Sequence, residues 1–188
     1  MAIKLSALRK LMLMNNTIVA VGRVSVDLYG LEAGAAFASE QTFSKSVGGS
    51  PSNVAVAAAK LGNHAVLLTK VGSDPLGQYI VNKLDSWGVD TKYVLTESNG
   101  LTPVVLAALD PPEDPKLIFH RQPNAPDTTI NSESIPKNLI DECGVFWMSG
   151  CALAHGETAK SSFKWLAQRN RKPHTIIDLD YRPSFWSS

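Results

Sequence analysis

Short apolar runs, separated by polar segments that contain glycine, recur along most of the chain. Apolar runs of this length are typical of strands that are buried on both faces of a parallel sheet. Such runs occupy residues 16–21, 64–71, 145–149 and 175–179. The pattern therefore predicts four strands, of which 16–21 and 145–149 are expected to be buried.

Other segments have apolar or alanine residues at helical spacing and predict helices. They cover residues 50–61, 74–88 and 157–169. Pro51 suits the first turn of the first of these helices, and Gly62 suits its C-terminal cap. In the third helix, Phe163 and Leu166 are predicted to face inward.

The alternation of strands and helices favours an α/β protein whose parallel sheet has right-handed crossovers. A second, smaller sheet is predicted from residues 41–47 and from a hairpin within residues 102–121. The two arms of this hairpin are extended runs that flank a proline-rich turn. We expect the small sheet to stand apart from the main one.

The chain has 188 residues, with 18 Lys and Arg against 17 Asp and Glu, so its formal net charge is +1. This charge gives no basis for binding nucleic acid or an anionic membrane. No apolar run reaches the ~18 residues of a membrane-spanning helix. Cys143 and Cys151 are too few for a disulfide scaffold or a four-ligand zinc site. No secretory signal is recognisable, so we expect a cytoplasmic protein with an extension at 1–15 and a domain at 16–188.

The densest candidate for chemistry is the pair Gly48 and Gly49, directly before the first predicted helix. Glycines lack a Cβ, so a ligand can approach the backbone there, and the helix start offers unpaired N–H donors. Asn53, one turn into the helix, can both donate and accept hydrogen bonds, which suits a polyol. The alternative is that the glycines form only a tight turn and that Asn53 only begins a helix.

The segment 48–72 resembles the N-terminal signature of the ribokinase-like (PfkB) carbohydrate kinases. The signature reads Gly-Gly-x-Pro-x-Asn-x-Ala, six residues, Gly, nine residues, Gly, and every fixed position is filled. The stretches at 21–27, 72–77 and 87–90 resemble further recurring segments of the family, in the same order. The resemblance implies a parallel sheet flanked by helices with a small β-sheet lid. It also implies that Gly48, Gly49 and Asn53 bind a sugar.

Asp27 follows the first predicted strand, at the carboxyl edge where open α/β sheets bind ligands. A carboxylate there can accept hydrogen bonds from two neighbouring hydroxyl groups. The family resemblance assigns Asp27 to the sugar. The alternative is that Asp27 only caps a turn.

Two arginines lie in stretches that resemble kinases of acidic sugars within this family. They are Arg121, in the segment 120–127, and Arg182, in the segment 178–186. A guanidinium binds a carboxylate or phosphate through two parallel hydrogen bonds. Both are therefore candidates to hold the acid group of the substrate or the transferred phosphoryl group. The alternative is a structural ion pair, for example between Arg182 and Asp178 or Asp180.

The resemblance implies an ATP-dependent kinase, using Mg²⁺, that phosphorylates a primary hydroxyl of a sugar acid such as 5-dehydro-2-deoxygluconate. 2-Keto-3-deoxygluconate, fructose and nucleosides stay open as substrates. In the family, the catalytic base is the Asp of a Gly-Ala-Gly-Asp motif, far downstream of the stretch that matches 178–186. This chain contains no such motif. We therefore predict a partial ribokinase-like domain, truncated before the nucleotide-binding half, with no catalytic, cofactor or metal residue of its own.

Two functional hypotheses remain. The chain is either the sugar-binding portion of a kinase, inactive by itself, or a catalytically inert module that binds sugar or oligomerises. A homodimer through the lid is compatible with both. A truncated sheet is also expected to expose an edge strand and apolar surface.

Overall fold

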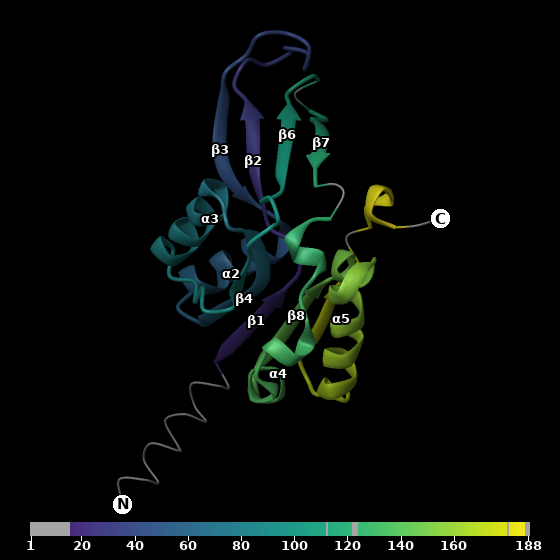
Figure 1. Cartoon of the computed structure of the whole chain (residues 1–188). Helices are drawn as coiled ribbons and strands as arrows, with labels where there is room; N and C mark the ends of the chain where they lie inside the picture. Colours follow the sequence, from purple (N-terminus) through teal and green to yellow (C-terminus); the bar gives the residue numbers. More distant parts are fainter. Residues whose placement is uncertain (1–15, 112, 122–123, 180, 187–188) are drawn as a thin grey trace, which may run out of the picture.

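A central sheet of five parallel strands organises the molecule, in the order β5-β4-β1-β8-β9 (Figure 1). The computed structural model describes residues 16–111, 113–121, 124–179 and 181–186, so the predicted extension at 1–15 lies outside the described residues. In sheet order the strands are Val94–Glu97 (β5), His64–Gly72 (β4), Thr17–Val21 (β1), Val145–Ser149 (β8) and Thr175–Asp178 (β9).

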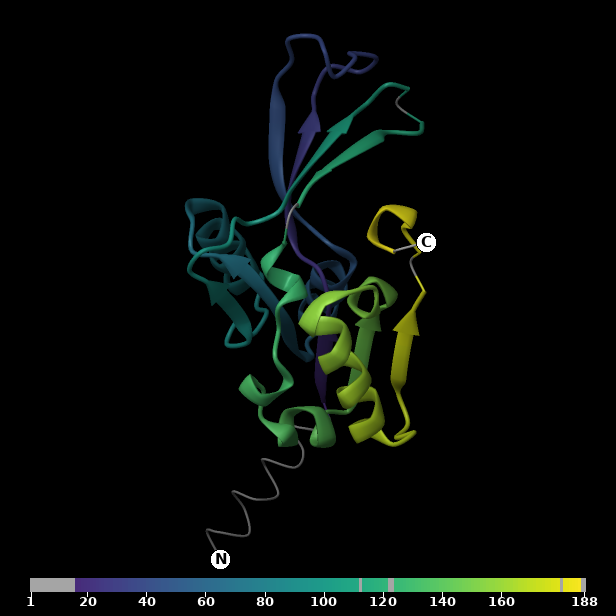
Figure 2. The same cartoon turned by 45° about the vertical axis from the view of Figure 1, so that its right-hand side comes forward.

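A second sheet of four strands projects beyond one end of the central sheet (Figures 1 and 2). In sheet order its strands are Phe43–Gly48 (β3), Ser25–Gly30 (β2), Val104–Ala108 (β6) and Lys116–His120 (β7). Strand β2 is antiparallel to β3 and parallel to β6, and β6 is antiparallel to β7. We refer to this sheet as the lid.

Helices cover both faces of the central sheet. Helices α2 (Ser50–Lys60) and α3 (Pro75–Ser86) pack on one face, and α4 (Lys137–Glu142) and α5 (Gly156–Arg169) pack on the other. Because side chains alternate along β1, Ala20 enters the first core, whereas Val19 and Val21 enter the second. Among the described helices, none combines the length and apolar composition that a membrane span requires.

Four short 3-10 turns complete the described structure. They are Pro126–Thr128 (η1), Ser132–Ser134 (η2), Gly150–Leu153 (η3) and Pro183–Phe185 (η4). The last of them, η4, lies near the base of the lid (Figure 2). It brings the C-terminal end of the described chain toward strand β7.

The predicted fold class is confirmed: a parallel sheet, flanking helices and a small second sheet. The four predicted strands and three predicted helices are present, with ends shifted by a few residues at most, and the two strands predicted to be buried, β1 and β8, are mostly buried. Strands β2 and β5 and helix α4 were not predicted. Each has only four to six residues, which is too short for a clear period.

The predicted inward orientation of Phe163 is wrong, because its side chain is 61% exposed. The buried stripe of α5 instead runs through Thr158, Ser162, Trp165 and Arg169, which are three or four residues apart. Position 163 falls outside that stripe. Leu166, predicted to face the same way, is half-buried and packs against the second core.

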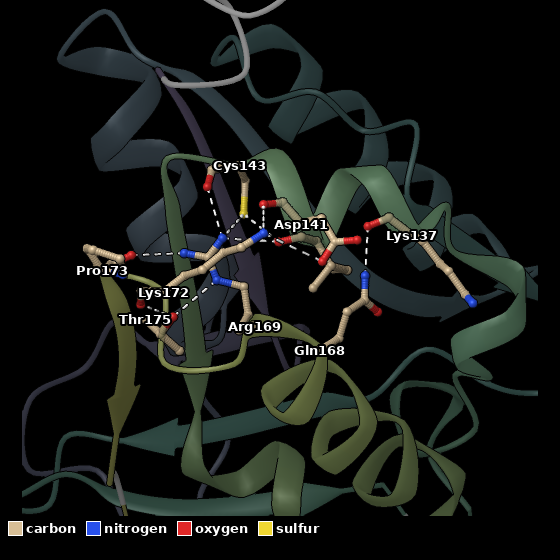
Figure 3. Close-up of polar contacts among 9 residues, drawn as sticks. Lys137, Asp141, Cys143, Gln168, Arg169, Lys172, Pro173 and Thr175 are labelled. Carbon is tan, nitrogen blue, oxygen red and sulfur yellow. Dashed lines mark hydrogen bonds and ion pairs between the residues drawn. The ribbon is translucent and has the colours of Figure 1, made fainter.

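Arg169 ties the last turn of α5 to the end of α4 (Figure 3). Its guanidinium donates to the carbonyl oxygens of Ile140 (3.1 Å), Cys143 (3.0 Å) and Pro173 (2.9 Å), while its Nε donates to the Thr175 hydroxyl (3.1 Å). The carbonyls at a helix end have no partner within the helix. Arg169, at 1% exposure, therefore supplies donors for the end of α4 from the neighbouring helix.

Candidate functional site

Asp27 lies within strand β2, at the base of the lid, and not in a loop after β1 as the sequence predicts. The carboxylate lies directly over the Cα of Gly48, the residue where β3 ends, and a Cβ at Gly48 would overlap it. The Ser25 hydroxyl donates to Asp27 Oδ1 at 2.6 Å. The structure therefore brings Asp27 and Gly48 together and fixes one carboxylate oxygen.

The electrostatic setting of Asp27 combines burial with nearby donors. Burial raises the pKa of this carboxyl, while the Ser25 hydroxyl, the charge of Arg23 and the Tyr29 hydroxyl lower it. The net direction is upward. Asp27 is thus partly desolvated but supported in its ionised form, and an ionised carboxylate is the form that accepts hydrogen bonds from hydroxyl groups.

The glycine pair accommodates groups of the protein itself. Above Gly48 lies the Asp27 carboxylate, and beside Gly49 lies the backbone of Arg23, so a Cβ at either glycine would clash. Gly49 also has φ of +108°, in the region that favours glycine. Their lack of side chains lets β2 cross close to the start of α2. Whether either glycine also contacts a sugar stays a prediction.

Asn53 is exposed on α2 and lies in a separate hollow, which Val47, Val56 and Trp87 also line. That hollow includes neither Asp27 nor Gly48. Val47 packs in the core on the side of α2 and α3. The structure therefore does not bring Asn53 together with Asp27, and a role of Asn53 in sugar binding stays a prediction.

Arg121 has the structural ion pair that was the alternative to substrate binding. Its guanidinium contacts Asp127 Oδ1 at 2.5 Å, and its side chain is 6% exposed. Burial raises the pKa of Asp127, against the charges of Arg121 and Arg23 and the Val24 amide, which lower it. The pair fixes the end of β7 to η1, and substrate binding by Arg121 stays a prediction.

Phe185 anchors the turn that follows Arg182. Its ring lies 3.9 Å from the Arg23 guanidinium carbon, 5.0 Å from that of Arg121, and 5.2 Å from the Phe119 ring in an edge-to-face contact. Arg182 itself is exposed, three residues before this anchor. Of its predicted alternative partners, Asp180 lies outside the described residues. Substrate binding by Arg182 stays a prediction.

An enclosed pocket of about 10 Å³ lies beneath Phe185, lined by Arg23, Arg121, Asp127 and His155 among others. This volume holds about one water molecule and excludes a sugar. A sugar would therefore have to lie outside this pocket, on the open side of Asp27. Sequence reasoning missed Arg23 and Phe185. The only available signal for Arg23 was a charged residue between two apolar stretches.

A family model of the pfkB family carbohydrate kinases matches residues 15–188. The chain belongs to this family. The PfkB signature at 48–72 runs from the last residue of β3 through α2 to the last residue of β4.

Curated relatives within the PfkB family are similar along most of the chain. The 5-dehydro-2-deoxygluconokinase of Geobacillus kaustophilus is 33% identical over 172 residues, which cover 90% of this chain and 51% of the relative. The protein of the same name from Lacticaseibacillus casei is 30% identical over 173 residues, with 91% and 53% covered. The chain therefore spans about half the length of these relatives.

Solved structures of PfkB kinases share the fold. The fructokinase of Xylella fastidiosa with bound ATP superposes with a TM-score of 0.79 at 24% identity, covering 93% of this chain and 52% of that one. The 2-dehydro-3-deoxygluconokinase of Thermotoga maritima gives a TM-score of 0.76 at 24% identity, with 91% and 53% covered. At these identities the similarity shows the architecture alone.

Within residues 16–111, 113–121, 124–179 and 181–186, no three His, Cys, Asp or Glu side chains cluster to hold a metal ion. The two carboxylates of the site, Asp27 and Asp127, bind Ser25 and Arg121. We therefore assign no step to Mg²⁺ or ATP on these residues.

Proposed function

We propose that this chain is the sugar-binding portion of an ATP-dependent kinase that phosphorylates a primary hydroxyl of a sugar acid, 5-dehydro-2-deoxygluconate or a close relative. The observation that carries the proposal is the Asp27 carboxylate held over Gly48 at the base of the lid. The segments that carry Arg121 and Arg182 lie close to one another near this region. Phe185, three residues after Arg182, contacts the guanidinium groups of Arg121 and Arg23. The names of the curated relatives support the substrate class.

In this proposal Asp27 orients the sugar. Ser25 occupies one side of the carboxylate, and the remaining lone pairs accept hydrogen bonds from sugar hydroxyl groups. The guanidinium of Arg182, which is exposed, pairs with the acid group of the sugar. Arg121 supports this arrangement through its ion pair with Asp127, which holds the end of β7 against η1.

The transfer of the phosphoryl group needs bound ATP, Mg²⁺ and a base for the attacking hydroxyl. No described residue is assigned to any of these, and the relatives are about twice as long as this chain. We expect the pure 188-residue chain to bind the sugar acid without phosphorylating it. Measurable ATP-dependent phosphorylation by this chain would overturn that part of the proposal.

The second candidate function is a catalytically inert module that oligomerises. It is favoured by strand β9, which pairs only with β8 in the described sheet and exposes Ile176, Ile177 and the following Leu179. Exposed apolar side chains on an edge strand favour association. Sugar binding that depends on Asp27 distinguishes the two functions, because association through β9 does not need that carboxylate.

The decisive experiment measures binding of 5-dehydro-2-deoxygluconate by calorimetry to the wild type, Asp27→Asn and a control, Asp90→Asn. Asp90 faces His64 at the opposite end of the sheet. A hydrogen bond to a charged group contributes about 1.5–3 kcal/mol, so Asp27→Asn should weaken binding roughly 10- to 100-fold. Asp90→Asn should bind like the wild type. Equal affinity of both variants would overturn the proposal.

The role of Arg182 is tested with the same sugar acid and its neutral counterpart, in which a hydroxymethyl group replaces the carboxylate. Arg182→Ala should weaken binding of the acid and leave that of the neutral sugar nearly unchanged, since a guanidinium pairs with the carboxylate alone. Equal losses for both compounds would show that Arg182 does not recognise the acid group.

A further inference from the structure

Strand β2 presents a row of polar groups beside Asp27. Residues two apart along a strand lie on one face, so Ser25, Asp27 and Tyr29 share a face of the lid. Directly opposite on β3 are Gly48, Ser46 and Ser44, respectively. Cross-strand partners point to the same side of a sheet. This face of the lid therefore carries hydroxyl groups beyond the carboxylate assigned to the sugar.

The opposite face of the lid is used for packing. Val26, Leu28 and Val47 alternate with the polar row and join the core that contains Ile80 and Leu84 of α3. The polar face instead continues across the lid to Phe119, whose partner on β6, Val105, is also the neighbour of Asp27. Because Phe119 contacts Phe185, this face adjoins η4 and the Arg182 segment.

Tyr29 follows Asp27 in this row, two residues further along β2, and the two side chains influence each other's pKa. Its side chain is 39% exposed. Interaction with the Tyr29 hydroxyl lowers the pKa of Asp27, and burial followed by the negative charge of Asp27 raises the pKa of Tyr29. A hydroxyl group beside an ionised carboxylate turns its proton toward it, because the carboxylate only accepts hydrogen bonds. The lone pairs of the Tyr29 oxygen are then left to accept from another group.

We propose that Tyr29 is a further specificity-determining residue, which together with Asp27 accepts hydrogen bonds from two adjacent hydroxyl groups of the sugar. The inference rests on the proposed function, because it extends the same site outward along β2. Asp27 accepts the first hydroxyl and Tyr29 accepts the second. The site selects sugars with an intact pair of neighbouring hydroxyl groups over analogues that lack one of them.

This selectivity has a physical basis in unmatched polar groups. A site that hydrogen-bonds a substrate hydroxyl discriminates against the analogue that lacks it, since the protein group then loses its partner. Tyr29 remains partly exposed, so water replaces part of the lost interaction. A hydrogen bond between neutral groups contributes about 0.5–1.5 kcal/mol, which corresponds to roughly 2- to 12-fold in affinity.

The chain offers a matched control for removal of a tyrosine hydroxyl from the lid. Tyr79 of α3 donates to the backbone carbonyl of Lys45 on β3 at 3.0 Å, from the packed side of the lid. Tyr29→Phe and Tyr79→Phe each remove one hydroxyl group that interacts with the lid. Only Tyr29→Phe removes a group from the polar face.

The experiment uses the full chain and titrates 5-dehydro-2-deoxygluconate and the two analogues that each lack one of its adjacent secondary hydroxyl groups. The analogue with the smaller loss of affinity in the wild type is the one that lacks the hydroxyl assigned to Tyr29, and it is the analogue to compare with the intact compound. The wild type and Tyr79→Phe should prefer the intact compound by about 3- to 10-fold. Tyr29→Phe should bind the intact compound more weakly by a similar factor and lose the preference. In the absence of sugar, NMR titration should show a higher pKa for Asp27 in Tyr29→Phe, but not in Tyr79→Phe.

The outcomes separate this inference from the proposed function. If the wild type binds neither compound, or if Asp27→Asn binds as well as the wild type, the proposed function and this inference are both overturned. If binding depends on Asp27 but Tyr29→Phe keeps the preference, only the role of Tyr29 is overturned. The same conclusion follows if Tyr29→Phe loses affinity equally for both compounds, or if the pKa of Asp27 does not move.

Discussion

Replacement of Arg169 by methionine tests how the end of α4 is stabilised (Figure 3). Methionine has a long apolar side chain, similar in shape to the aliphatic part of arginine. Arg169→Met therefore keeps much of the packing beside Trp165 but removes every hydrogen-bond donor of the guanidinium. Two buried acceptors lose the guanidinium: the Cys143 carbonyl oxygen, and the Ile140 carbonyl oxygen, which keeps only the weak Cys143 thiol donor at 3.4 Å. The carbonyl of Pro173 and the hydroxyl of Thr175 are reached by water more easily, because their contacts with Arg169 are part-buried.

The magnitude follows from these acceptors. A buried acceptor without a partner costs about 1–3 kcal/mol, so two such carbonyls would account for about 2–6 kcal/mol, and the thiol that still donates to Ile140 places the loss in the lower half of this range. Removal of a buried positive charge recovers part of this, because the guanidinium no longer has to be desolvated. We therefore expect Arg169→Met to lower the free energy of unfolding by about 3 kcal/mol. For a chain of this size, that corresponds to a fall in Tm of about 6–12 °C.

The assay is urea and thermal unfolding, followed by the fluorescence of buried Trp165 and by circular dichroism, with Gln168→Met as the control. Gln168 is the preceding residue and also donates to α4, to the Lys137 carbonyl at 2.8 Å, but this hydrogen bond is exposed. Its loss should change stability by about 0.5 kcal/mol or less. If both variants unfold at the same urea concentration, the hydrogen bonds of Arg169 do not stabilise the end of α4.

Three further outcomes follow from other parts of the structure. Burial would raise the pKa of Asp74, but hydrogen bonds from the Thr102 and Gly77 amides outweigh burial, and the net shift is downward. The ionised carboxylate of Asp74 therefore stabilises the fold above about pH 4, and this stabilisation is lost as the pH falls through the lowered pKa. Asp74→Asn should therefore lose less stability than the wild type during acid titration, and parallel curves would contradict this. Phe185→Leu should lower the free energy of unfolding by about 1–2 kcal/mol and speed hydrogen exchange in residues 181–186, since the guanidinium and ring contacts are lost. Unchanged exchange would show that Phe185 does not hold this segment in place. In sedimentation velocity, the wild type should self-associate as its concentration rises, and Ile177→Lys should self-associate less. A wild type that is monomeric at all concentrations would show that edge strand β9 does not mediate association.

Local signals account for what the sequence predicted of the fold. Helix α2 begins with Pro51 in its first turn and is followed by Gly62 at φ of +85°, and both features are visible in the sequence. Strand β2 has one apolar face, which packs against α3, and one polar face around Asp27. The alternation covers only six residues, shortly after β1, which is too few to set β2 apart as a strand of its own.

The relative positions of the site residues depend on contacts that no local pattern contains. The sequence places Gly48, Gly49 and Asn53 within six residues, yet the glycines contact Asp27 and Arg23, while Asn53 lies in a different hollow. Which side chains meet at the site depends on how the lid strand β2 crosses the start of α2. That crossing is a tertiary contact between segments that are about 20 residues apart in the sequence, so no local pattern reveals it.

The charges beside Asp27 bear on which arginine could recognise the acid group in the proposed function. The buried groups form a balanced set, in which Arg23 lowers the pKa of both Asp27 and Asp127 and Arg121 pairs with Asp127. Two positive charges already face two negative ones, so a carboxylate that enters with the sugar meets no excess positive charge in this set. Arg182 lies outside the set, is exposed, and is tethered to it through Phe185. The proposed function therefore assigns the acid group of the sugar to Arg182, because a carboxylate bound by Arg23 or Arg121 would compete with Asp27 or Asp127 in a partly desolvated setting.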